Sequence, residues 1–156
     1  MSGLTFEKDG KGGFFMYPEA KGREEGCHIT PFDGSIEIAI RKMEQCMCEN
    51  GEINLDFEDF SKGEYIFASQ EIQTEEGRLT EEAWRAYEAF LKELAKKVKM
   101  KQKVIIQMRA RKLGMVSANE IIETAMKELG EDSSADYFWG LTSTEDEEEC
   151  VNFWIG

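Results

Sequence analysis

Apolar residues recur every three to four positions in three segments of the chain, and this spacing predicts three helices. The first helix is expected over about 35–49. The second follows Thr80, a good N-terminal cap. The third is expected to begin at Ser117, because Ser117 and Glu120 have the spacing of a capping box, and to end at Gly130.

Other segments alternate apolar and polar residues, which is typical of half-buried strands. Two short apolar segments flank an Asp-Gly turn and predict a hairpin. A strand from about Lys103 to Arg111 is expected to have a basic outer face, and one over 53–58 an acidic outer face. The predicted strands lie at 4–6, 14–17, 27–30, 53–58, 65–68, 103–111, 137–141 and 151–155.

These elements favour a single acidic α+β domain over residues 1–156. We expect a mainly antiparallel sheet of about five to seven strands packed against three helices. The length and a hydrophobic content of 41% are sufficient for a packed core.

Charge is unevenly distributed along this chain, whose formal net charge is −13. Residues 92–112 hold nine Lys or Arg and one acid, whereas the remainder carries a net charge of −21. Residues 128–156 hold nine acids and no Lys or Arg. This asymmetry predicts either charged partners or two regions of the fold that neutralise each other.

The expected location is the cytoplasm. No apolar run approaches the ~20 residues needed to cross a bilayer, and the first residues lack the pattern of a signal peptide. The four cysteines are therefore predicted to be free thiols.

Cysteine and histidine are the candidates for nucleophilic or metal chemistry. Cys27 precedes His28, the only histidine, but neighbours on a strand point to opposite faces. Cys46 and Cys48 are ~200° apart on a helix, so one metal ion cannot easily take both. Cys150 could still approach His28 in space. We favour a structural role for all five residues and expect no metal site.

Carboxylates offer one pair worth testing for catalysis, Asp56 and Glu58, which would share one strand face. The glycines at 10–13 do not match a phosphate-binding loop. No cofactor is expected.

The leading functional hypothesis is a non-enzymatic protein-binding module. A small acidic domain suits an inhibitor that covers a basic, nucleic-acid-binding surface of its target. Bacterial immunity proteins and phage anti-defence proteins such as anti-CRISPRs have this size and charge, which is an analogy of type and not a motif match. The partner-binding residues would be the acids Asp56, Glu58, Glu145, Asp146, Glu147, Glu148 and Glu149.

Two alternatives remain at this stage. The basic segment 92–112 could bind nucleic acid through Lys99, Lys101, Lys103, Arg109 and Arg111, although it carries no aromatic residue for base stacking. Less favoured is a hydrolase or nuclease whose site has no recognisable motif. The pattern does not predict an oligomeric state.

Overall fold

The computed structural model describes residues 3–33, 35–49, 51–98, 102–130 and 135–156. Seven strands form one mixed sheet in the order β1-β2-β3-β4-β9-β7-β8, and β5 and β6 form a small separate hairpin. The expected α+β fold is confirmed. The strands are β1 (Leu4–Lys8), β2 (Phe14–Pro18), β3 (Cys27–Pro31), β4 (Glu64–Glu71), β5 (Thr74–Glu75), β6 (Arg78–Leu79), β7 (Lys103–Ala110), β8 (Asp136–Ser143) and β9 (Cys150–Ile155).

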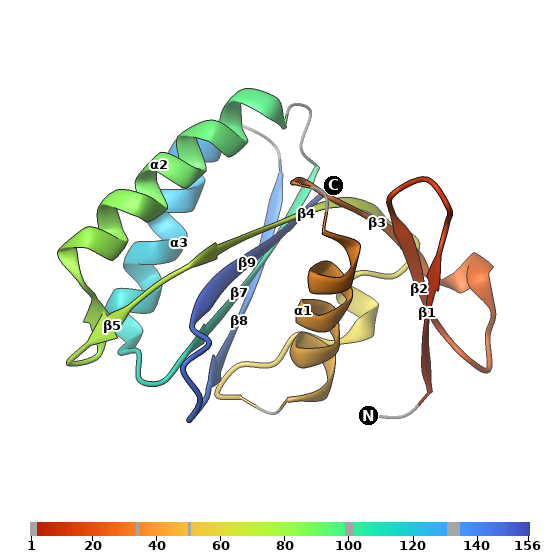
Figure 1. Cartoon of the computed structure of the whole chain (residues 1–156), viewed down its shortest axis with the longest axis horizontal. Helices are drawn as coiled ribbons and strands as arrows, with labels where there is room; N and C mark the ends of the chain where they lie inside the picture. Colours follow the sequence, from red (N-terminus) through yellow and green to blue (C-terminus); the bar gives the residue numbers. More distant parts are fainter. Residues whose placement is uncertain (1–2, 34, 50, 99–101, 131–134) are drawn as a thin grey trace.

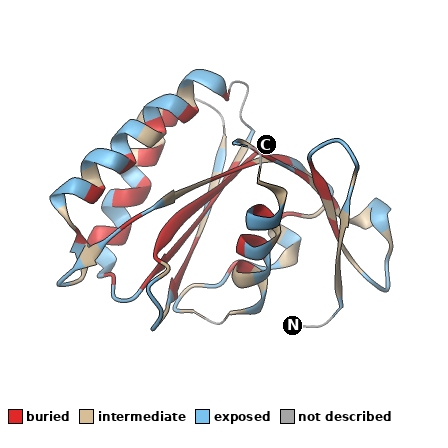
Figure 2. Ribbon diagram, in the orientation of Figure 1, coloured by how far each residue is buried: buried red, intermediate tan, exposed pale blue. Residues whose placement is uncertain are grey.

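Helices cover both faces of the sheet (Figure 1). On one face, α2 (Glu81–Lys97) and α3 (Met115–Leu129) pack on the even-numbered core residues of β7 and the odd-numbered ones of β9. On the other face, α1 (Ile36–Cys48) packs against a second core cluster that includes Ile105 and Trp154. The central strands are therefore buried on both sides (Figure 2).

Side-chain caps define two of the three helix starts as predicted. The Ser35 side chain accepts from the amide of Ile38, and the Thr80 side chain accepts from that of Ala83. The third prediction is wrong, because α3 begins at Met115 after Gly114, and Ser117 is buried within the helix.

The predicted strand over 53–58 is also wrong. Ile53 makes one isolated bridge to Leu141 of β8, and Phe57–Asp59 form a short 3-10 helix, η2. Asp56 caps η2: its side chain accepts from Glu58 N, while the Asp59 side chain accepts from Asp56 N. Local capping of this kind competes with a strand ladder.

A chain of polar side chains, three buried and one half-buried, crosses four adjacent strands on the α1 side of the sheet. Ser69 of β4 donates to Asn152 of β9 at 2.6 Å, and Asn152 donates to Gln107 of β7 at 2.9 Å. Gln107 in turn donates to Thr142 of β8 at 3.3 Å. These hydrogen bonds compensate for burying polar groups in the middle of the sheet.

Among the described residues, no helix has the length and apolar character needed to cross a membrane.

Candidate functional site

Arg109 organises the acidic end of the molecule. It lies near the end of β7 and its side chain is 1% exposed. The guanidinium donates to both carboxylate oxygens of Glu49, at the end of α1, at 2.9 and 3.0 Å. It also donates to both oxygens of Asp146, at 3.0 and 2.8 Å, and this pair holds the pKa of Asp146 well below its usual range.

Two neighbouring acids also anchor the segment that leads into β9. Glu148 accepts from Lys42 of α1 at 2.6 Å, which lowers the pKa of Glu148. Glu149 is 4% exposed and accepts from the backbone amide of Arg111. Of the predicted partner-binding run, Asp146, Glu148 and Glu149 are therefore engaged with basic residues or backbone of the same chain.

Several acids of this region are exposed, including the paired Asp146. Glu145, Asp146 and Glu147 are exposed. Glu52, from the segment after α1, is also exposed and accepts from the backbone and hydroxyl of Ser143. We call Glu49, Glu52, Glu145, Asp146 and Glu147 the acidic edge.

Asp56 and Glu58 lie elsewhere. Both are exposed, but η2 is at the opposite end of β8, where Lys103 donates to the carbonyl of Asp59. The structure therefore does not join them to the acidic edge. They do not share a strand face either, since they belong to the η2 cap.

The predicted basic outer face of β7 is wrong. The strand lies between β9 and β8 and is buried from Val104 to Ala110, so it has no outer face. Arg109 is enclosed by carboxylates, and Arg111 pairs with Glu149 at 3.8 Å. Lys99 and Lys101 lie outside the described residues. Sequence reasoning missed the burial of Arg109, although the acids that compensate it were visible as an excess of negative charge.

The cysteines lie as the helix and strand geometry predicted. Cys27 is buried in the α1 core on the side of β3 opposite to His28, and burial raises the pKa of its thiol to about 12. Cys46 is buried and Cys48 is exposed. Cys150 is fully buried and lies 3.2 Å from the Lys42 ammonium. Across the described part of the chain, no three potential ligand side chains converge on a point that could hold a metal ion.

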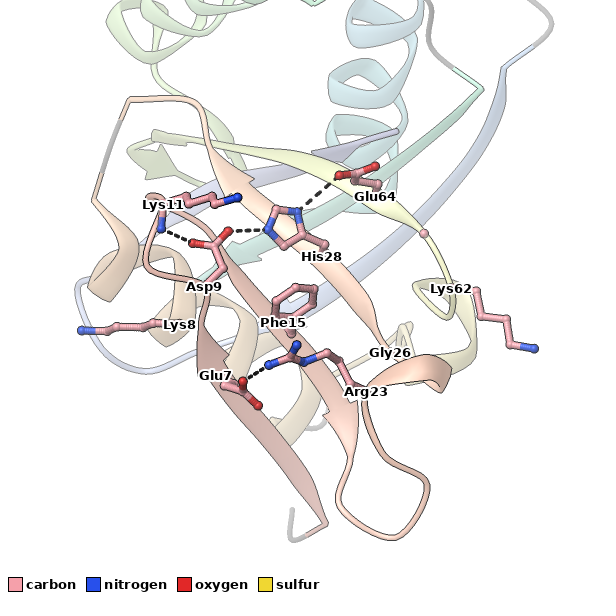
Figure 3. Close-up of a pocket in the computed structure, with 11 residues that line it drawn as sticks. Glu7, Lys8, Asp9, Lys11, Phe15, Arg23, Gly26, His28, Lys62 and Glu64 are labelled. Atoms are coloured by element: carbon pink, nitrogen blue, oxygen red, sulfur yellow. Dashed lines mark hydrogen bonds and ion pairs between the residues drawn. The ribbon is translucent and has the colours of Figure 1, made fainter.

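A second candidate site is a hollow of about 800 Å³ over the part of the sheet that no helix covers (Figure 3). Strand register places Glu7, Phe15, His28 and Glu64 in one row across β1 to β4. The Phe15 and His28 rings are 4.8 Å apart between centroids. The Arg23 guanidinium, from the 3-10 helix η1 (Arg23–Glu25), lies 4.4 Å above the Phe15 ring.

Asp9 holds the β1–β2 turn next to the row of side chains that crosses β1 to β4. One of its oxygens accepts from the amides of Lys11 and Gly13, and the other is 2.7 Å from His28 Nε2. The bond to His28 is the largest influence that lowers the pKa of Asp9 to about 2. His28 Nδ1 is buried without a hydrogen-bond partner and lies 3.5 Å from Glu64, within ion-pair distance only.

Comparisons with known proteins add little to this geometry. No family model matches the chain, and no curated protein matches it. Among solved structures, a W319Y mutant of FtsZ from M. jannaschii is similar at 18% identity and a TM-score of 0.49, over 75% of this chain and 36% of that chain. The chain thus spans about a third of that protein. A likeness this low carries no argument about function.

Proposed function

We propose that this chain is a non-enzymatic protein-binding module that acts in the cytoplasm and inhibits its target by covering a basic, nucleic-acid-binding surface with the acidic edge. The observation that carries the proposal is the fourfold engagement of Arg109, which ties Glu49 to Asp146. The tie holds segments far apart in sequence side by side, so their charges are positioned before a partner arrives. Preorganised charge favours fast association and specificity.

Exposed apolar residues at the same end of the sheet support a protein partner. Met115 and Val116, in the first turn of α3, are 49% and 75% exposed. The α3 helix follows β7 beyond the end where Arg109 lies, and Thr144 bonds back to Ala110 there. Exposed apolar residues at the same end of a molecule as exposed charge fit the composition of a protein interface.

Free thiols support the cytoplasmic part of the proposal. Among the described residues, Cys27, Cys46 and Cys150 are free, buried thiols. Persistent free thiols are typical of a reducing compartment.

The test compares capture of proteins from a cell lysate by wild type and by two charge-reversal variants. The edge variant carries Glu145→Lys and Glu147→Lys, because neither side chain bonds to another described residue. The control carries Glu88→Lys and Glu123→Lys, exposed positions on α2 and α3, so its net charge is the same.

We expect a protein partner that survives nuclease treatment and binds the edge variant about tenfold more weakly, while the control binds like wild type. Equal losses in both variants would show that only net charge matters. Capture that disappears with nuclease would overturn the proposal and favour a nucleic-acid ligand.

A further inference from the structure

Figure 3 shows two basic side chains, those of Lys11 and Arg23, directed toward the hollow. The chain has 19 Lys and Arg against 32 Asp and Glu. Four cations and three acids belong to the lining of the hollow, but the side chains of Lys8 and Lys62 point away from it (Figure 3) and pair with Glu37 and Glu25.

Two of the three acids in the hollow are held in place by hydrogen bonds. Glu7 accepts from the Tyr17 hydroxyl and from Arg23, and these bonds lower its pKa. Asp9 is bound by His28 and by two backbone amides. Glu64 faces His28 at its edge.

One of the cations that line the hollow, Lys11, has no acidic partner among the described residues. Lys8 pairs with Glu37 and Lys62 with Glu25. The Lys11 side chain is exposed and makes no hydrogen bond or ion pair with the described residues. An ammonium in this setting is available to an anionic group of a ligand.

Flat groups form the floor of the hollow. The phenyl ring of Phe15 lies between the His28 imidazole and the Arg23 guanidinium, and both aromatic side chains are only partly buried. Arg23 is 53% exposed, so its guanidinium can leave the ring without disturbing a core contact, at the cost of its ion pair with Glu7. Aromatic faces beside cations are the arrangement on which nucleobases stack.

We propose that the hollow binds a nucleoside monophosphate unit, with the base stacked on Phe15, the His28 ring tilted by 52° beside it, and the phosphate at Lys11. The base takes the place that Arg23 fills in the free protein, and the released guanidinium adds a second cation for the phosphate. The same unit occurs free and within single-stranded nucleic acid, and the experiment distinguishes the two sources.

The test follows backbone amide signals of Gly13, Gly26 and Gly63 by NMR while ligands are added to the full chain. The ligands are adenosine and uridine monophosphate, adenosine, inorganic phosphate and a short single-stranded RNA. Lys11→Ala removes the unpaired ammonium, and Lys21→Ala is the matched control because Lys21 is exposed and does not line the hollow. Phe15→Leu tests the stacking, with a thermal melt to verify folding.

We expect both monophosphates to shift these signals with a dissociation constant of about 1 mM or tighter, a low but measurable affinity. Lys11→Ala and Phe15→Leu should each weaken binding at least about fivefold, and Lys21→Ala should not. Tighter binding of the RNA would assign the unit to a single strand. No shifts, equal affinity for inorganic phosphate, or an equal loss in the Lys21 control would overturn the proposal.

Discussion

Arg109 and Asp146 form a two-point ion pair although 37 residues separate them in the chain. The arginine is enclosed and the aspartate is 57% exposed, so the pair joins the interior of the sheet to its surface. The same guanidinium holds Glu49, which makes it the point where β7, the end of α1 and the acidic run meet.

Replacing Arg109 should destabilise the fold. Arg109→Leu removes the compensating charge from Glu49 and Asp146 and leaves carboxylates close together. Breaking a buried pair costs about 3–5 kcal/mol, but the carboxylates left behind are 36% and 57% exposed, so we expect a loss of about 1–3 kcal/mol. Chemical denaturation measures the free energy of unfolding, and a loss below about 1 kcal/mol would contradict this role.

The stability of the fold should depend on Asn152, which links Ser69 and Gln107 in the hydrogen-bonded chain of polar side chains. Asn152→Ala removes a fully buried side chain and leaves the half-buried Ser69 and the buried Gln107 without it as a partner, although Gln107 keeps its bond to Thr142. We expect a loss of about 1–3 kcal/mol in the free energy of unfolding, because one buried unsatisfied group costs about 1–3 kcal/mol. Ser69→Ala, at the end of the chain of bonds, should cost less than Asn152→Ala, and the reverse order would contradict the network.

Asp9 should make stability depend on acidic pH. Its pKa falls from an ordinary value of 3.8 to about 2 in the folded protein, so the unfolded chain binds the proton more readily. The stabilisation is complete above 3.8 and is lost as the pH falls through about 2. The difference in unfolding midpoint between wild type and Asp9→Asn should shrink over this range. A constant difference would show that the Asp9 charge is not involved.

Thiol reagents should separate Cys48 from the other cysteines. Cys48 is exposed, whereas Cys27, Cys46 and Cys150 are buried and burial raises the pKa of each of their thiols. In the native protein one thiol should react fast, and Cys48→Ser should remove this phase. The other three should react only after denaturant is added. A second fast thiol in the native state would contradict the burial.

Much of the fold was predictable because local patterns and tertiary packing agree. The helix after Thr80 and the hairpin turn at Asp9 are both present as predicted, because each is determined by residues close in sequence. The segment 53–58 alternates like a strand, but the Asp56 and Asp59 caps supply local bonds that the period cannot reveal. The periodicity of apolar residues predicts which positions can share a face, but it does not show local hydrogen bonds that compete with a strand.

The candidate sites were less accessible to sequence reasoning. The segment from Lys103 to Arg111 forms a strand, but this strand is central and covered on both faces, so Arg109 is buried. Its charge is tolerated because Glu49 and Asp146, which are distant in the sequence, lie next to it in the fold. The hollow depends on the register of four strands, which places His28 beside Phe15 and Asp9. This relationship cannot be predicted from the spacing of residues along the chain.

The position of β9 has a consequence for synthesis. This strand joins β4 to β7, so the two halves of the sheet share no direct strand pairing until Cys150–Ile155 has left the ribosome. Before then, β4 and β7 each present an unpaired edge, and such edges are prone to associate with other chains. An intermediate in which β9 has not yet joined the sheet is therefore prone to aggregation, and a chaperone that shields β4 and β7 would act on this intermediate.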